Sequence, residues 1–306
     1  DMLVKASIPI TSGFEDTTTT YTNAGKVRNQ GIEMSLHTIN LTGELGWETN
    51  LTATYNKNKI KDLNSDVPYY INQINNSYVT MLAKDYPINV FYGYVTDGIF
   101  QNQSEVNTHA VQPGAEPGDI RFIDQNGDGM LDTNDRVKVG SGTPKVSLGF
   151  NINLAYKDFD LVANFYGDFG AKRYNYTKYQ LERMDHVFNY GKNALNAWTP
   201  ENPDTDIPRA VSGDPNKNSR TSTRFVENGD YLRLNNLQIG YNLPVKYCKK
   251  MGLSNLRIYV GATRLFTITN YKGYDPSTGS SVGQMGYDYA AIPLSRDFMM
   301  GLKFGF

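Results

Sequence analysis

A regular alternation of apolar and polar side chains is the feature that most constrains the fold of this chain. In "LGFNINLAY", residues 148–156, large apolar side chains occupy every second position, and Gly, Asn and Ala lie between them. Successive side chains of a β-strand point to opposite faces of a sheet, so this period of two predicts a strand with one apolar face. The same alternation predicts strands at 31–39, 47–55, 159–169, 255–262 and 297–306, and further strands fit at 3–10, 90–100 and 231–241.

The lengths of the connections favour lipid, rather than the core of a soluble domain, as the cover of these apolar faces. Tight turns are predicted at "NLTGELG" and "YKDF", whereas roughly 25 residues follow Ile60 and roughly 50 separate Gly170 from Arg224, which is long for a soluble β domain. Short turns at one rim and long loops at the other are typical of outer-membrane barrels. The sequence therefore predicts an all-β fold, a transmembrane antiparallel β-barrel segment.

Other classes of protein fit the sequence less well. A soluble, calcium-stabilised, glycan-binding β domain is the alternative, because the strands of a β-sandwich also alternate. A barrel enzyme would need a nucleophile–base pair, and the three scattered His residues offer none, so we predict no enzymatic activity. The net charge of −1 argues against a nucleic-acid partner. A single cysteine, Cys248, excludes a disulfide within the chain.

The number of barrel strands is expected to be even, because the first predicted strand runs outward and the last runs inward. Nine strands are predicted above, and "DIRFID", residues 119–124, is the expected tenth. The pair Asn235-Asn236 shifts the phase of its strand and predicts a β-bulge. Because the sequence opens within a strand-like stretch, we expect it to be a piece of a longer protein.

Several stretches are recognisable when they are taken in order along the chain. They are "NAGKVRNQGIEMSL" (23–36), "FYGYVTDGIFQ" (91–101), "PGDIRFIDQNGDGMLDTNDRVKVGSGTPKVSLGF" (117–150), "FVENGDYLRLNNLQIGYNLP" (225–244) and the terminal aromatic strand. This series resembles the C-terminal part of SusC-like TonB-dependent transporters, which are outer-membrane importers of Bacteroidetes, and the likeness runs across nearly the whole chain.

The resemblance implies a fold and a set of partners. It implies a 22-stranded barrel in the bacterial outer membrane, of which residues 1–306 would supply about ten strands, without the plug domain or the TonB box. The importer would carry oligosaccharides or oligopeptides, work with a SusD-like surface lipoprotein as its lid, and be energised by TonB–ExbB–ExbD through the missing N-terminal part. A dimer of transporter–lid pairs is the assembly that the resemblance implies.

One stretch has the spacing of a metal-binding loop. In "DQNGDGMLDTND", residues 124–135, oxygen ligands recur as in an EF-hand, with Gly129 at the sharp turn. The predicted ligands are Asp124, Asn126, Asp128, the Met130 carbonyl, Asp132 and Asp135. A hard cation such as Ca²⁺ prefers these oxygens, and Asp in place of Glu at the last position predicts modest affinity. The alternative is a polar turn of Asx residues and glycines without an ion.

Aromatic residues in the longest predicted loop are the candidates for substrate contact. They are Tyr174, Tyr176, Tyr179 and Trp198. Their rings would stack on sugars, or they would pack the loop on itself or against the lid, and the second interpretation is the stronger one. A short helix is expected at 176–184.

Overall fold

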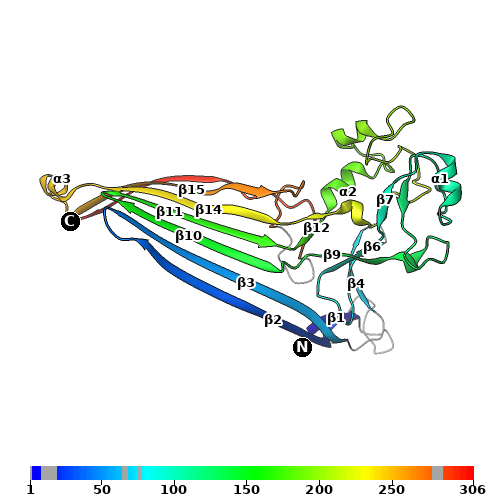
Figure 1. Ribbon diagram of the computed structural model, residues 1–306, viewed down its shortest axis with the longest axis horizontal. Helices are drawn as coiled ribbons and strands as arrows, with labels where there is room; N and C mark the ends of the chain where they lie inside the picture. The colour runs from blue at the N-terminus through cyan, green and yellow to red at the C-terminus, as the bar shows by residue number, and fades with distance from the viewer. Residues whose placement is uncertain (1, 8–18, 64–67, 75–76, 278–284) are drawn as a thin grey trace.

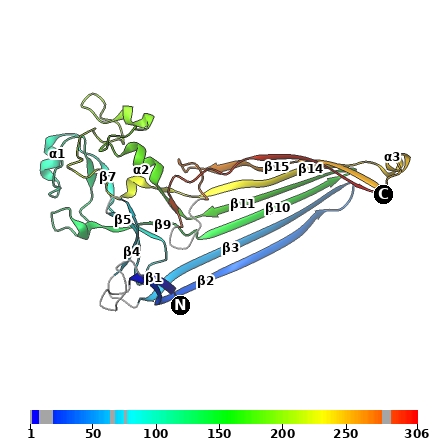
Figure 2. The same ribbon diagram turned by 180° about the vertical axis from the view of Figure 1, so that it is seen from behind.

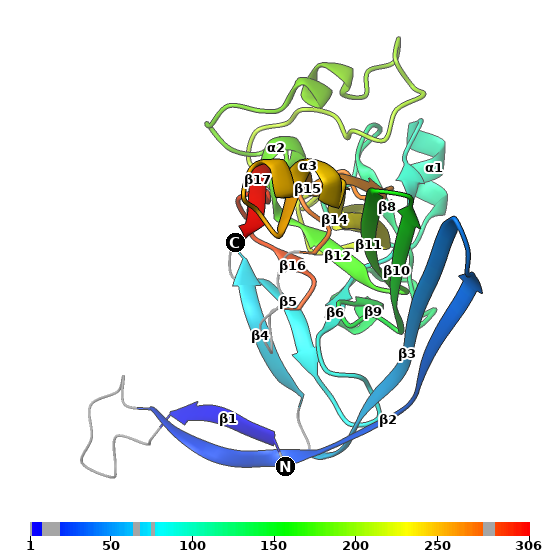
Figure 3. The ribbon, with the colours of Figure 1, turned by 90° about the vertical axis from the view of Figure 1, so that its left-hand side faces the viewer.

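Eight antiparallel strands form one long open sheet, which dominates the molecule (Figures 1 and 2). The computed structural model describes residues 2–7, 19–63, 68–74, 77–277 and 285–306. The strands of the long sheet, in spatial order, are β1 (Met2–Ser7), β2 (Thr19–Leu41), β3 (Leu45–Leu63), β10 (Val146–Tyr156), β11 (Phe159–Phe169), β14 (Tyr231–Asn242), β15 (Asn255–Thr269) and β17 (Asp297–Gly305). Seen along its length the sheet curves into an arc (Figure 3).

The strand register sorts the side chains into one apolar row and one polar row. Every strand of the long sheet except β1 contributes one residue to the apolar row, and neighbours in the row are register partners. The seven residues are Leu41, Trp47, Leu154, Leu161, Ile239, Val260 and Met300. Seven more form the polar row on the opposite face: His37, Asn50, Asn151, Asn164, Asn236, Thr263 and Asp297. The ring atom Nδ1 of His37 is hydrogen-bonded to Asn50 Oδ1 at 2.7 Å.

Within the described part of the chain, no second layer of protein covers the apolar row. Most of its side chains are strongly exposed, and Met300 reaches 79%. A β-sandwich would bury such a row against a facing sheet. The exposed row therefore argues against the soluble alternative.

Two register irregularities keep these faces continuous. The first irregularity is a bulge at Asn235 on β14, which shifts the register with β11 between Asn164 and Phe165 and the register with β15 between Leu234 and Asn236. This confirms the bulge predicted at Asn235-Asn236. A second shift between Ile39 and Leu41 realigns β2 near its turn. An extra residue at each shift restores the phase, because a slip of one residue would otherwise turn every side chain to the other face.

The connections differ at the two ends of the sheet, as the sequence predicted. At one end lie the short joins 42–44 and 157–158, and the join 243–254 that carries α3 (Val245–Lys250) (Figure 1). At the other end lie the long joins 64–145, 170–230 and 270–296. We call the described residues of these three long joins the loop body.

Small sheets and short helices organise the loop body. The small sheets contain β4 (Tyr69–Ile74), β5 (Ser77–Leu82), β6 (Val90–Gly93) and β9 (Val137–Ser141); β7 (Thr96–Ile99) and β8 (Ile120–Phe122); and β12 (Lys172–Asn175), β13 (Val226–Asn228) and β16 (Tyr287–Asp288). The helices are α1 (Gln103–Thr108), α2 (Tyr176–Glu182) and the 3₁₀ turns η2 (Thr133–Asp135), η3 (Lys192–Asn196) and η4 (Thr223–Phe225). None of the helices that the structure describes is both long and apolar enough to span a bilayer.

Two predicted barrel strands belong to the loop body. Residues 90–100 form β6 and β7, and 119–124 contains β8, which pairs with β7. The prediction that 90–100 and 119–124 are strands of the barrel was therefore wrong, although the expected even number holds for the described eight-stranded sheet. The strand predicted at 3–10 appears as β1, and residues 8–10 lie outside the described residues. The strand β6 is buried on both faces, which a membrane-facing strand would not be.

Candidate functional site: the loop body

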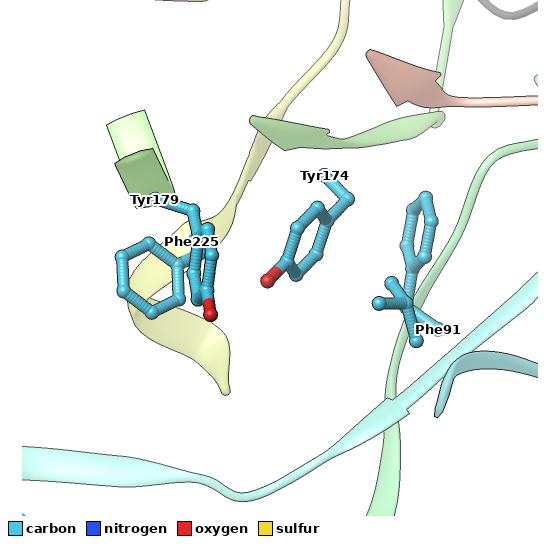
Figure 4. Close-up of a cluster of buried hydrophobic side chains, with 5 residues drawn as sticks. Phe91, Tyr174, Tyr179 and Phe225 are labelled. Carbon is cyan, nitrogen blue, oxygen red and sulfur yellow. The ribbon is translucent and has the colours of Figure 1, made fainter. Parts of the chain in front are cut away.

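Aromatic rings from separate joins meet in the first core of the loop body (Figure 4). Phe91 comes from β6, Tyr174 from β12, Tyr179 from α2 and Phe225 from η4. The centroid of the Tyr174 ring lies 6.3 Å from that of Phe91 and 6.2 Å from that of Phe225. Burial of such rings is the main stabilising contribution available to loops without long strands. This core therefore ties the join before β10 to the join after β11.

A second core stabilises the outer part of the loop body. It consists of Ile99, Ile120, Phe122, Leu131 and Trp198, and Tyr94 packs against it. The Trp198 indole donates from Nε1 to Gln101 Oε1 at 2.9 Å, so the polar atom of this nearly buried ring is satisfied. The indole also lies against Gly118, where a Cβ would meet the ring at 2.4 Å.

The burial of the predicted aromatic site residues favours the packing interpretation. The exposed fraction is 0% for Tyr174, 3% for Tyr179 and 9% for Trp198, so none of these rings offers a face to a ligand. Tyr176 is half-buried and stacks on Tyr289, with ring centroids 4.2 Å apart. Tyr289 is exposed. Of the predicted aromatic residues, only Tyr176, in this pair, is open enough to stack on a substrate, and that contact stays a prediction.

The aspartate-rich loop, residues 124–135, follows β8, ends with η2 and is held by hydrogen bonds to its own backbone. Asp124 accepts from the N–H of Gly127 at 2.7 Å and of Gly129 at 2.8 Å. Both glycines adopt positive φ, which a residue without a Cβ tolerates. These donors, led by the Gly129 N–H, hold the pKa of the Asp124 carboxyl below its ordinary value.

The remaining predicted ligands of this loop also serve backbone turns. Asn126 accepts from the Asp128 N–H, and Asp128 accepts from the Met130 N–H. Asp135 is buried and accepts from the N–H of Asp132 at 2.8 Å, forming a capping box. Among the described residues, no group of three or more His, Cys, Asp or Glu side chains is arranged to hold a metal ion. The geometry fits the polar-turn alternative, and Ca²⁺ binding stays a prediction.

A buried network around Asp119 fixes β8 beside the join after β11. Asp119 is fully buried and accepts from Arg209 Nε at 3.0 Å and from Asn218 Nδ2 at 2.9 Å. Asn218 in turn accepts from the Ile120 N–H at 2.7 Å. A buried carboxylate needs such partners, because an unpaired one is strongly destabilising.

Beside this network lies a cavity of about 610 Å³ that is rich in cations. Arg136, Lys217 and Arg220 line it together with Tyr78 and Tyr94, and Asp132 of the aspartate-rich loop borders it. The Arg220 guanidinium lies 4.8 Å from the centre of the Tyr94 ring, which fixes its position. We call this space the arginine cavity. Both guanidinium groups also donate to backbone carbonyls, Arg136 to those of Tyr78 and Tyr92 and Arg220 to that of Asn216.

Sequence reasoning did not find the arginine cavity. Arg136 follows the aspartate-rich loop, and Arg220 lies in a polar stretch far along the chain. Neither arginine has a motif around it, and only the folding of two joins against each other brings them together. The one signal in the sequence was the unusual length of the joins themselves.

No family model matches the chain, but individual relatives do. TonB-dependent receptor P3 of Formosa agariphila is 33% identical over 319 residues, and TonB-dependent receptor SusC of Bacteroides thetaiotaomicron is 26% identical over 318 residues. Both alignments cover all of this chain, but only 31% and 29% of the receptors. The solved structure of the RagAB peptide transporter is also similar, with a TM-score of 0.78 and 25% identity, over all of this chain and 32% of that chain.

The fold and the comparisons together define the class of protein. A curved antiparallel sheet with an exposed apolar row, a polar row behind it and large loops at one end is a segment of a transmembrane β-barrel wall. The chain is homologous to TonB-dependent receptors of the SusC and RagA type, and it spans about a third of their length. Such receptors are β-barrels of the bacterial outer membrane and are not enzymes.

Proposed function

We propose that the chain forms part of the wall and of the extracellular loops of an outer-membrane active importer of oligosaccharides or oligopeptides. The observation that carries the proposal is the pair of opposed rows, one apolar and one polar, that cross seven strands in register. Lipid would cover the apolar row and water in the lumen would cover the polar row. TonB–ExbB–ExbD is the energy source that we propose for this uptake.

A SusD-like lipoprotein is the partner that we propose for the tip of the loop body. The join after α2 stands out from the rest of the molecule (Figure 3). It carries Val187, Phe188 and Leu195, and Val187 is 97% exposed. Large apolar side chains so exposed in a loop are typical of a protein interface. In the proposed assembly, two transporter–lid pairs form a dimer.

The arginine cavity supports a cargo with anionic groups. Three cationic side chains and two tyrosine rings line it, and such a lining suits a carboxylate next to an apolar or ring-shaped moiety. Oligopeptides carry a terminal carboxylate, and acidic oligosaccharides carry one on the ring. The similarity to the RagAB peptide transporter supports peptides as the cargo. The similarity to SusC supports an importer of the SusC type but does not distinguish between cargoes.

Uptake by cells that produce the full-length receptor tests this proposal. We expect the receptor in the outer-membrane fraction, and we expect cells that lack either the receptor or TonB to lose uptake of one cargo class, peptide or glycan. Arg136→Gln should weaken uptake of an acidic cargo, whereas Arg121→Gln, which removes an arginine paired with Asp97 outside the cavity, should not. A receptor that purifies without detergent, or uptake that does not depend on TonB, would refute the proposal.

Calcium binding by the aspartate-rich loop is a separate proposal. It rests on the spacing of oxygen groups from Asp124 to Asp135. A bound ion would stiffen the loop beside the arginine cavity, since Asp132 belongs to both.

A further inference from the structure

The apolar face of β3 gives way to cations near the loop body. Tyr55, Lys57 and Lys59 alternate along one strand and share the face of the apolar row. Their register partners on β2 are Ile32, Gln30 and Arg28. Ile32 and Tyr55 are exposed and end the apolar surface on these two strands. Within about 7 Å along the strand, that surface becomes basic.

The arrangement of these cations is unfavourable without an anion. Arg28 lies directly opposite Lys59 in the register, and like charges in this position repel. Asp85 pairs with Lys59, with Nζ and Oδ1 2.8 Å apart. For Lys57 and Arg28, the described residues provide no ion pair. The face therefore has an excess of positive charge.

Two more lysines join this face around a cavity of about 450 Å³. Lys138 comes from β9, and Lys145 precedes β10 at the point where the Lys145 carbonyl accepts from the Asn56 N–H at 3.0 Å. Partial burial, and next the charge of Lys145, lower the pKa of the Lys138 ammonium. Neither lysine has a carboxylate partner among the described residues.

We propose that this basic pocket, lined by Lys57, Lys59, Lys138 and Lys145, binds the phosphate of a lipid headgroup in the outer leaflet of the membrane. The occupant follows from position and charge. Lys57 and Lys59 share the lipid-facing side of the wall with Tyr55, at the boundary of the apolar surface. The lining of the pocket also includes Asn56 and Asn58 of the opposite face and the carboxylate residue Asp85. Lysine stems lie along apolar surface while their ammonium groups reach the headgroup level. Phosphate oxygens accept charge-assisted hydrogen bonds from several ammonium groups at once.

Lipid retention by the full-length receptor in detergent tests this proposal. The probe is diphosphorylated lipid A, and native mass spectrometry measures the fraction of receptor that retains it. The variant is Lys57→Gln with Lys145→Gln. Since a lysine near a charged membrane surface contributes about 1 kcal/mol, each loss should lower the affinity about fivefold, or roughly 25-fold together. The matched control is Lys249→Gln with Lys250→Gln in α3, at the opposite end of the sheet.

The outcomes distinguish a headgroup site from a site for soluble anions and from a loss of folding. The proposal is supported if the Lys57/Lys145 variant loses lipid A, the α3 variant retains it, and lipid A without phosphates does not bind. It is overturned if both variants retain the lipid equally or lose it equally. It is also overturned if millimolar inorganic phosphate displaces the lipid completely, because the pocket would then bind soluble anions. Both variants should migrate as folded barrels in unboiled SDS, which excludes misfolding as the cause.

Discussion

Replacement of Ile152 by arginine tests directly which face of the sheet meets lipid. Ile152 lies on the apolar face of β10, between its register partners Thr49 and Ala163. The neighbouring Asn153 points to the polar face, opposite Glu48. Asn153→Arg is therefore the matched control: it adds the same charge one residue away, and Glu48 is positioned to pair with it.

The depth of Ile152 in the membrane follows from the length of β10. The strand has 11 residues and, at about 3.4 Å per residue, covers about 34 Å. With the roughly 40° tilt of barrel strands, it crosses about 26 Å, close to the height of the apolar band. Ile152 is four residues from Tyr156 at the turn end, which places it about 10 Å inside that edge and near the middle of the band.

The expected cost of Ile152→Arg is about 2–4 kcal/mol, the range for arginine near the bilayer midplane. This range corresponds to roughly a 30- to 700-fold loss in the folding equilibrium constant. Guanidinium titration of the full-length receptor in lipid vesicles, followed by tryptophan fluorescence, measures the change. Asn153→Arg should change the free energy of unfolding by less than about 1 kcal/mol. Equal effects of the two substitutions, or a larger effect at Asn153, would refute the assignment of the faces.

Three further predictions concern the loop body. Phe225→Ala should destabilise the first core by about 3–5 kcal/mol and expose the loop body to limited proteolysis, while the sheet keeps its resistance to unboiled SDS. Val187→Asp with Leu195→Asp should leave the receptor folded but weaken co-purification of the lid; unchanged recovery of the lid would place its contact elsewhere. The pKa of Asp124 is lowered in the folded state, so its contribution to loop stability is present above the ordinary value of 3.8 and is lost as the pH falls below that value; protease cleavage at 124–135 should therefore rise at such low pH. At neutral pH, bound Ca²⁺ should slow this cleavage until a chelator is added. Cleavage that does not respond to the chelator would contradict calcium binding.

The sequence by itself determined the long sheet. The period of two is a local property of the chain, so it located seven strands of the long sheet and assigned their faces, and a break in it located the bulge at Asn235-Asn236. The lengths of the joins then separated the turn end from the loop end. Both signals depend on near neighbours in sequence or on simple counting, which is why they needed no tertiary information.

Only the tertiary structure decided which short strands belong to the wall. The alternation in 90–100 and 119–124 is the same whether lipid or protein covers the apolar side, and the pairing of β6 with β9 and of β7 with β8 settled the matter. In the same way, the burial of Tyr174 and Trp198 and the meeting of Arg136 with Arg220 depend on contacts between distant joins. A local pattern states that a face must leave water, but the partner that covers it is set by the packing of segments far apart in the chain.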